Sequence, residues 1–253
     1  MRKNALLVAF AAALLLIGAG CDTVVTLEKP SVTYEAINSG AELRLTWTAV
    51  TDAKEYEITT DDSVFTTTAS PFDVKSTTGT IEVRAVNGSD KSDPFTLDLT
   101  AKLTASITVY GKSDTAASHP SGIGFNTDGT ALAVSLTNQA SQVEFVMDDV
   151  SFAPAMYLFG PTGYTPPVNT WGNAVQLSTT AFDSLTVAPA SGNYDLYLQI
   201  AQNATYAAWL DHNDDGLIDA TDHFAKLKIE SINGAVVTVK LAYQKIGGLR
   251  WLM

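Results

Sequence analysis

The sequence of 253 residues is 46% apolar and 17% charged, which is the composition of a folded chain of one or two domains and not of a disordered one. Lys and Arg together number 15 against 27 Asp and Glu, so the formal net charge at pH 7 is −12. Such a surface repels the phosphates of nucleic acids and of anionic lipid headgroups. We therefore expect no nucleic-acid partner, whereas cations are suitable ligands.

The first twenty residues have the three parts of an export signal. Arg2 and Lys3 supply positive charge, residues 5–17 form an unbroken apolar run, and residues 18–20 are small. A membrane-spanning helix needs about 20 apolar residues, so this run is too short to be one. The sequence predicts a signal peptide over residues 1–20 and an extracytoplasmic location for the remainder.

Cys21, the only cysteine, follows directly on the small residues. This arrangement resembles the bacterial lipobox, in which a cysteine after small residues receives diacylglycerol and marks the cleavage site. Gly18 departs from that pattern, which usually has an aliphatic residue there. The resemblance implies a bacterial lipoprotein attached to a membrane through lipid on Cys21, with residues 21–25 as a linker. It leaves the inner and the outer membrane open, and the alternative is an ordinary signal peptide with a cysteine nearby by chance.

Residues 26–100 consist of short runs in which apolar and polar residues alternate, for example Leu43, Leu45 and Trp47 with polar residues between them. A period of two, interrupted by turn residues, is typical of sandwich strands with one solvent-facing side. Segments 43–47 and 83–87 also resemble two strands of a fibronectin type III domain. That resemblance implies that Trp47 lies between the sheets and that the module is a spacer or a protein-binding unit.

Residues 103–253 continue the period of two, around positions 132–136, 143–147, 194–200 and 237–243, and no long segment has helical spacing. We expect a second, larger sandwich of about eight to ten strands. The predicted fold class is therefore all-β, with two β-sandwich domains in tandem.

Residues 211–222 have the spacing of a twelve-residue calcium loop of the EF-hand type. Gly216 stands where the chain must turn sharply, and Ile218 is the apolar anchor. Without a cation the four carboxylates of the loop repel one another, whereas with calcium they serve as hard oxygen ligands. The expected ligands are the Leu217 carbonyl and the side chains of Asp211, Asn213, Asp215, Asp219 and Asp222.

The flanks of this loop differ from a helix-loop-helix. Residues 225–229 alternate as a strand, whereas residues 206–210 fit a helix or a strand equally well. The loop also resembles a dockerin repeat, which has Asp at the twelfth place, but a dockerin needs two repeats and this chain has one. We expect a structural calcium site between two strands, with modest affinity because Asp222 reaches less far than Glu. The alternative is an acidic hairpin tip that holds no ion.

Residues 157–171 are rich in aromatic residues, Gly and Pro, and Tyr164 and Trp171 are candidates for a ligand surface because their rings suit sugars. The alternative is that these rings plug one end of the sandwich. His212 and His223 are expected to face solvent, and Asp148 is interpreted as a surface residue. No nucleophile elbow, P-loop or dinucleotide fingerprint is present, so we predict no enzymatic activity and no catalytic residue.

Taken together, these features predict a lipid-anchored extracytoplasmic protein that binds or scaffolds, with the first module as a spacer and calcium as a structural ion. Exposed rings in residues 157–171 would favour a polysaccharide as the ligand. Buried rings would favour a purely structural or protein-interaction role with an envelope protein as partner. A glycoside-type hydrolase would require a cleft with two facing carboxylates.

Overall fold

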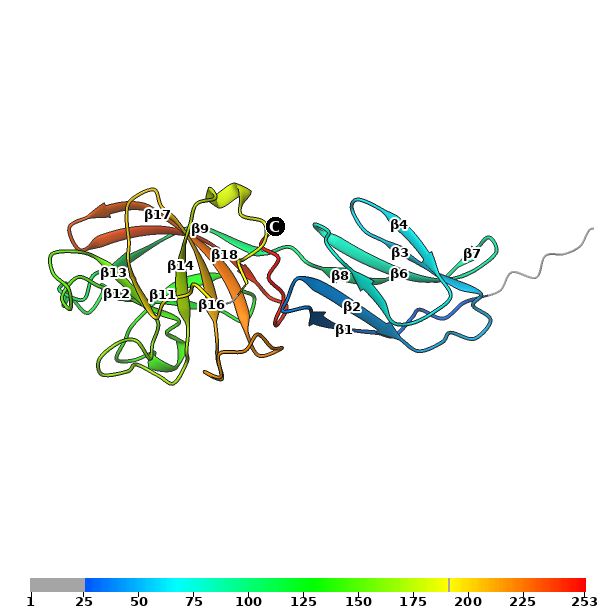
Figure 1. Cartoon of the computed structure of the whole chain (residues 1–253), viewed down its shortest axis with the longest axis horizontal. Coiled ribbons are helices and arrows are strands. Elements are labelled where there is room, and N and C mark those ends of the chain that lie inside the picture. The colour runs from blue at the N-terminus through cyan, green and yellow to red at the C-terminus, as the bar shows by residue number, and fades with distance from the viewer. Residues whose placement is uncertain (1–25, 191) are drawn as a thin grey trace, which may run out of the picture.

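The structure, a computed structural model, describes residues 26–190 and 192–253, so Cys21 and the predicted signal peptide lie outside the described residues. Two β-sandwiches lie end to end (Figure 1). This architecture confirms the predicted all-β class. In the part of the chain that the structure describes, no helix is both long and apolar enough to span a membrane.

The first sandwich packs a three-stranded sheet, in the order β1-β2-β5, against a sheet in the order β4-β3-β6-β7, in which β8 also pairs with β6. Trp47 is only 6% exposed and packs on Tyr56 across the two sheets, with ring centroids 5.1 Å apart. Its predicted burial is confirmed. The strands are β1 (Val32–Ile37), β2 (Glu42–Trp47), β3 (Glu55–Thr59), β4 (Val64–Thr67), β5 (Phe72–Val74), β6 (Thr80–Asn87), β7 (Asp90–Lys91) and β8 (Phe95–Asp98).

The second sandwich has two five-stranded sheets, in the orders β11-β10-β12-β13-β15 and β14-β16-β17-β18-β9. Phe145 and Leu158 from the first of these sheets meet Tyr206 and Leu227 from the second in one core. The strands are β9 (Lys102–Tyr110), β10 (Gly122–Phe125), β11 (Ala131–Val134), β12 (Phe145–Asp148), β13 (Tyr157–Phe159), β14 (Ala174–Ser178), β15 (Tyr197–Gln199), β16 (Thr205–Leu210), β17 (His223–Asn233) and β18 (Val236–Gln244).

Strand β16 is buried along its whole length, which explains why its sequence shows no alternation. One face contacts the core through Tyr206 and Leu210. The other face carries Trp209, which is covered by Leu185 and by Leu252 near the C-terminus. Because both faces are covered, β16 has no alternating polar residues, and alternating polar residues are the pattern by which a strand is predicted from sequence.

The C-terminal residues 246–253 belong to both sandwiches. Ile246, Leu249 and Trp251 are part of the hydrophobic core of the first sandwich. Within the same segment, the Arg250 N–H donates to the Gly40 carbonyl at 3.0 Å, and the Leu252 N–H donates to the Thr186 carbonyl at 2.7 Å. The junction is therefore a packed and hydrogen-bonded interface and not a flexible linker.

Candidate metal centre

The predicted calcium loop connects β16 to β17, which are neighbouring antiparallel strands of one sheet. Residues 206–210 are therefore strand, and the expected placement of the loop between two strands is observed. The adjacent strand ends hold both ends of the loop, so Asp211 and Asp222 lie at its base.

The backbone of the loop turns where the sequence pattern requires it. Gly216 has φ +70° and Asp214 has φ +55°, in the left-handed region that Gly and Asp tolerate. The Gly216 N–H donates to Asp211 Oδ2 at 3.0 Å, and the Leu217 N–H donates to Asp215 Oδ1 at 2.7 Å. These bonds use one oxygen of each carboxylate and fold the first half of the loop back over its base.

The amide of Asn213 lies between two carboxylates. Its Nδ2 donates to Asp215 Oδ2 at 3.1 Å and to Asp219 Oδ2 at 3.0 Å. An amide NH2 group is a weak positive pole, and here it separates two like charges. A cation bound by Asp215 and Asp219 would replace this group, and Asn213 would then have to offer its carbonyl oxygen as a ligand.

Asp211 and Asp222, at the base of the loop, are both buried, and each has one oxygen, Oδ1, without a hydrogen-bond partner. Burial raises the pKa of Asp222 to about 6, and the charges of Asp211 and Asp219 add to the effect, while a hydrogen bond from the Asp219 N–H and the nearby Trp209 side chain oppose it. Buried carboxylate oxygens without partners are costly, and a bound cation is one of the few groups that can satisfy them.

The residues present fit a hard cation, although the described residues contain no group of three or more His, Cys, Asp or Glu side chains already drawn together as a metal centre. The carboxylates are instead held apart by loop N–H groups and by Asn213. The four predicted Asp side chains, Asn213 and the Leu217 carbonyl lie in one short loop. The donor set is oxygen only, which is the chemistry that calcium prefers.

The histidines beside the loop do not face solvent, so that expectation was wrong. His212 is half-buried, donates a hydrogen bond from Nε2–H to the Glu144 carboxylate at 3.1 Å, and stacks on Trp171 with centroids 4.4 Å apart. Burial lowers the pKa of His212, but the hydrogen bond and charge of Glu144, with the charges of Asp222 and Asp211, raise it overall. His223 is half-buried against Tyr243, and burial lowers its pKa.

The two rings proposed as a ligand surface point inward. Tyr164 is only 5% exposed and packs edge-on against Phe159, and Trp171 is half-buried against His212. Tyr164 belongs to a hydrophobic cluster with Val146 of β12 and Phe159 of β13, whereas Trp171 lies beside loop 211–222. Asp148 is also buried and caps a turn through Ser151, which corrects its interpretation as a surface residue.

The neighbours of the loop come from distant parts of the sequence and had no local pattern to reveal them. Glu144 accepts a hydrogen bond from Asn173 Nδ2 at 2.6 Å in addition to its contact with His212. Gly172 lies so close to the loop that an added Cβ would be 2.1 Å from Asp214 Oδ1. The loop is thus embedded in the protein on this side, unlike a free hairpin tip.

No family model matches the sequence, and no curated protein matches it. Among solved structures, the chain is similar to a DUF4466 family protein from Parabacteroides merdae, with 10% identity, 88% of this chain and 100% of that chain covered, and a TM-score of 0.42. It is also similar to a protein described as FN3tt mut, with 24% identity over 28% of this chain and 92% of that one and a TM-score of 0.25.

A β-glucuronidase from glycoside hydrolase family 2 is similar at 11% identity, with 89% of this chain but 22% of that chain covered and a TM-score of 0.22. None of these likenesses is close enough to carry an argument about family or function. The functional argument therefore rests on the residues of the loop and of the junction.

Proposed function

We propose that the protein is a lipid-anchored extracytoplasmic scaffold in which calcium, bound by loop 211–222, stiffens the junction between two sandwiches. The observation that carries this proposal is the contact between the loop and the C-terminal turn. The Gly248 N–H donates to the Asp222 carbonyl at 2.8 Å. Gly247 lies so close to the loop that an added Cβ would be 2.0 Å from the Ala220 carbonyl oxygen.

This contact connects the predicted metal ligands to the first sandwich. Ile246 and Leu249, on either side of the two glycines, are in the core of the first sandwich. Asp219 and Ala220 of the loop also line a cavity of about 450 Å³ together with Tyr34 and Ala36 of β1. A cation that fixes the second half of the loop would therefore restrain the turn that joins the two sandwiches.

Calcium would supply positive charge and hard coordination, held by Asp211, Asn213, Asp215, Asp219, Asp222 and the Leu217 carbonyl. In the ion-free protein the buried carboxylate of Asp222 opposes folding, because burial removes its charge from water and holds it near the charges of Asp211 and Asp219. Binding relieves that cost. The stabilisation is then transmitted through the Asp222 carbonyl to Gly248.

The order of parts along the chain suits a spacer. The described chain begins at the end of the first sandwich that is farthest from the second sandwich (Figure 1). An anchor on Cys21 would leave the first sandwich next to the membrane and the calcium loop beyond it. The burial of Tyr164 and the inward packing of Trp171 favour this scaffold role over sugar binding by those two rings.

Calcium binding is tested by thermal unfolding of the mature protein in 10 mM calcium and in chelator. With a Kd of about 10⁻⁴ to 10⁻³ M, that concentration stabilises the folded state by about 1.4 to 2.7 kcal/mol. Asp211→Asn should lose this stabilisation, whereas the exposed Asp62→Asn, which removes the same charge elsewhere, should retain it. Unfolding midpoints that are the same in calcium and in chelator for the native protein would overturn the calcium proposal.

The anchor is tested separately with Cys21→Ser in the full-length chain. We expect the native protein in the membrane fraction and the variant in the soluble fraction, because the thiol that carries the lipid is removed. Metabolic labelling with a radioactive fatty acid is the second measurement, and it should label only the native protein. Membrane recovery of an unlabelled Cys21→Ser variant would contradict the anchor.

A second candidate function, polysaccharide binding, is favoured by a different set of rings. Phe152 and Tyr197 are each 46% exposed, and Tyr157 lies beside them, with centroid distances of 4.9 Å to Phe152 and 6.4 Å to Tyr197. Exposed aromatic faces with phenolic hydroxyls suit sugars. A glycan screen should then identify a ligand that Tyr197→Ala loses and that Asp62→Asn retains. If the screen identifies no ligand, polysaccharide binding is rejected and the scaffold role is the proposal that remains.

A further inference from the structure

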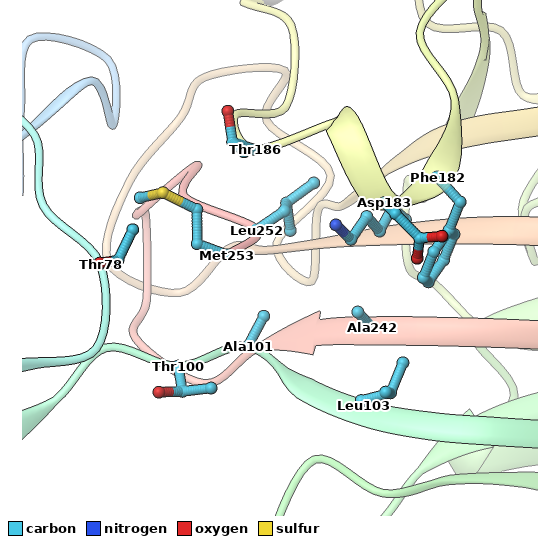
Figure 2. A pocket seen from close by; sticks show the side chains of 11 residues that line it. Thr78, Thr100, Ala101, Leu103, Phe182, Asp183, Thr186, Ala242, Leu252 and Met253 are labelled. Atoms are coloured by element: carbon cyan, nitrogen blue, oxygen red, sulfur yellow. The ribbon is translucent and has the colours of Figure 1, made fainter.

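A second cavity lies on the other side of the junction. It has a volume of about 410 Å³, within the range of about 300 to 1,000 Å³ typical of small-molecule sites. Its floor is a row across three neighbouring strands, Lys226 of β17, Ala242 of β18 and Leu103 of β9, which the strand register places opposite one another. Figure 2 shows Leu252 and Met253 on one side of this space and Ala101 and Leu103 on the other.

The lining is largely apolar and comes from both sandwiches. Thr78 belongs to the first sandwich, Thr100 to the connection between the two, and Thr186 to the segment that covers β16. The apolar contacts come from Ala101, Leu103, Phe182, Ala242, Leu252 and Met253. Leu103 is 54% exposed, so an apolar body that entered the cavity would cover a side chain that now faces solvent.

Two charged residues line this cavity, Asp183 and, at the base of the apolar surface, Lys226. Lys226 is 6% exposed, its Nζ donates to the Leu185 carbonyl at 2.9 Å, and it lies 4.8 Å from the centre of the Phe182 ring. Within the described residues, no carboxylate forms an ion pair with this ammonium group. A buried ammonium with three donors and one neutral acceptor has capacity for an anionic partner.

The charges around the cavity are the reverse of those of the whole molecule. The chain has a net charge of −12. In contrast, Lys226 and Lys228 of β17 and Lys240 of β18 gather near Asp183, whose carboxylate forms an ion pair with Lys240 at 3.1 Å. Burial lowers the pKa of Lys226 and Asp183 opposes that effect. Asp183 lines the cavity but is neutralised by its ion pair with Lys240, so Lys226 is the lining charge that can receive an anion.

We propose that this cavity binds a small amphiphilic carboxylate, with an aliphatic or aromatic body against Leu103, Phe182 and Met253 and a carboxylate on Lys226 Nζ. A single buried ammonium matches a singly charged head, whereas a phosphate dianion would call for more donors. The site is independent of the calcium loop, so failure of one proposal leaves the other standing. No bond is made or broken.

The experiment is calorimetric titration of the mature protein with three probes that share one body and differ in head charge: 4-phenylbutyrate, 4-phenyl-1-butanol and 4-phenylbutylamine. The carboxylate should bind most tightly, about tenfold or more above the alcohol, because a hydrogen bond to a charged group is the stronger one. The amine should bind most weakly. Equal affinities for the three heads, or no binding of the carboxylate, would overturn the proposal.

Two variants locate the binding. Lys226→Met keeps the aliphatic stem and should lower the affinity for 4-phenylbutyrate to that for the alcohol, and Ala242→Leu should abolish binding of both by filling the cavity. Lys54→Met, which removes an exposed ammonium outside the cavity, is the control and should keep native affinity for 4-phenylbutyrate. Unfolding curves establish that each variant is folded. Native affinity for 4-phenylbutyrate in folded Lys226→Met or in folded Ala242→Leu would exclude this site.

Discussion

At the scale of single residues, Asp222 carries a buried carboxylate that opposes folding of the ion-free protein. It is fully buried at the end of the loop, and its Oδ1 has no partner. Its pKa of about 6 lies above the ordinary 3.8, so the folded protein binds a proton there more tightly than the unfolded chain does. In the ion-free protein, the contribution of this group to stability is therefore greatest at low pH and falls as the pH rises through about 6.

The corresponding prediction is that Asp222→Asn stabilises the ion-free protein at pH 7. The amide removes the buried charge and keeps an oxygen that can accept the hydrogen bond from the Asp219 N–H. Its unfolding midpoint in chelator should exceed that of the native protein at pH 7, and the difference should shrink toward pH 4. Calcium should no longer raise the midpoint. A variant that melts below the native protein in chelator would contradict this account of Asp222.

At the scale of elements, the loop and the C-terminal turn are held together by the close approach of two backbones. Gly247 makes this approach possible because it has no Cβ, and Gly248 adds φ +71°. The turn also provides the N–H that bonds the Asp222 carbonyl. Loop 211–222 and the junction therefore form one packed unit, although 24 residues lie between Asp222 and Gly247 in the chain.

We predict that Gly247→Ala destabilises the protein by about 1 to 3 kcal/mol, because the added Cβ is 2.0 Å from the Ala220 carbonyl oxygen. It should also weaken calcium binding, since Ala220 lies within the loop. The control is Gly234→Ala in the β17–β18 hairpin, where φ is +62° and nothing lies within 4 Å of the added Cβ. This control should cost about 1 to 2 kcal/mol and leave calcium affinity unchanged. Calorimetric titration and thermal unfolding measure both effects.

At the scale of the whole molecule, the C-terminal segment fixes the two sandwiches to each other. Trp251 is buried in the core of the first sandwich, and its Nε1 donates to the Ala41 carbonyl at 3.1 Å. Arg250 donates through Nε to the Ser39 carbonyl at 2.7 Å and through its guanidinium to the Ala188 carbonyl. These bonds reach both sandwiches from two adjacent residues, so the junction should transmit unfolding between them.

Trp251→Ala is predicted to cost about 3 to 5 kcal/mol and to separate unfolding into two transitions, because the cavity it leaves lies at the junction. Differential scanning calorimetry should resolve the two steps, and small-angle scattering should report a wider range of overall dimensions. Leu158→Ala, in the core of the second sandwich alone, is the control. It should lower stability without a wider range of dimensions. A single sharp transition in Trp251→Ala would show that other contacts couple the sandwiches.

The sequence by itself determined the features that depend on local order. Alternation in β2 predicted its two faces, because side chains of a strand point alternately to either side. The burial of Trp47 was implied by the resemblance of this segment to a fibronectin type III strand. The spacing of residues 211–222 predicted the loop and its candidate oxygen ligands, since one short segment supplies them all. The first part of strand β17, which follows the loop, was also predicted from the sequence, because polar residues alternate with its apolar ones.

Only the tertiary structure decided what depends on contacts between distant segments. Strand β16 was ambiguous because both its faces are covered, one of them by residues from the C-terminus. The sequence left Tyr164 either exposed as part of a ligand surface or buried at one end of the sandwich, and the structure buries it, because its exposure depends on neighbours from other segments. The junction, the burial of Asp222 and the cavity at Lys226 arise where chain ends and strands far apart in sequence meet, and no local pattern encodes such a meeting.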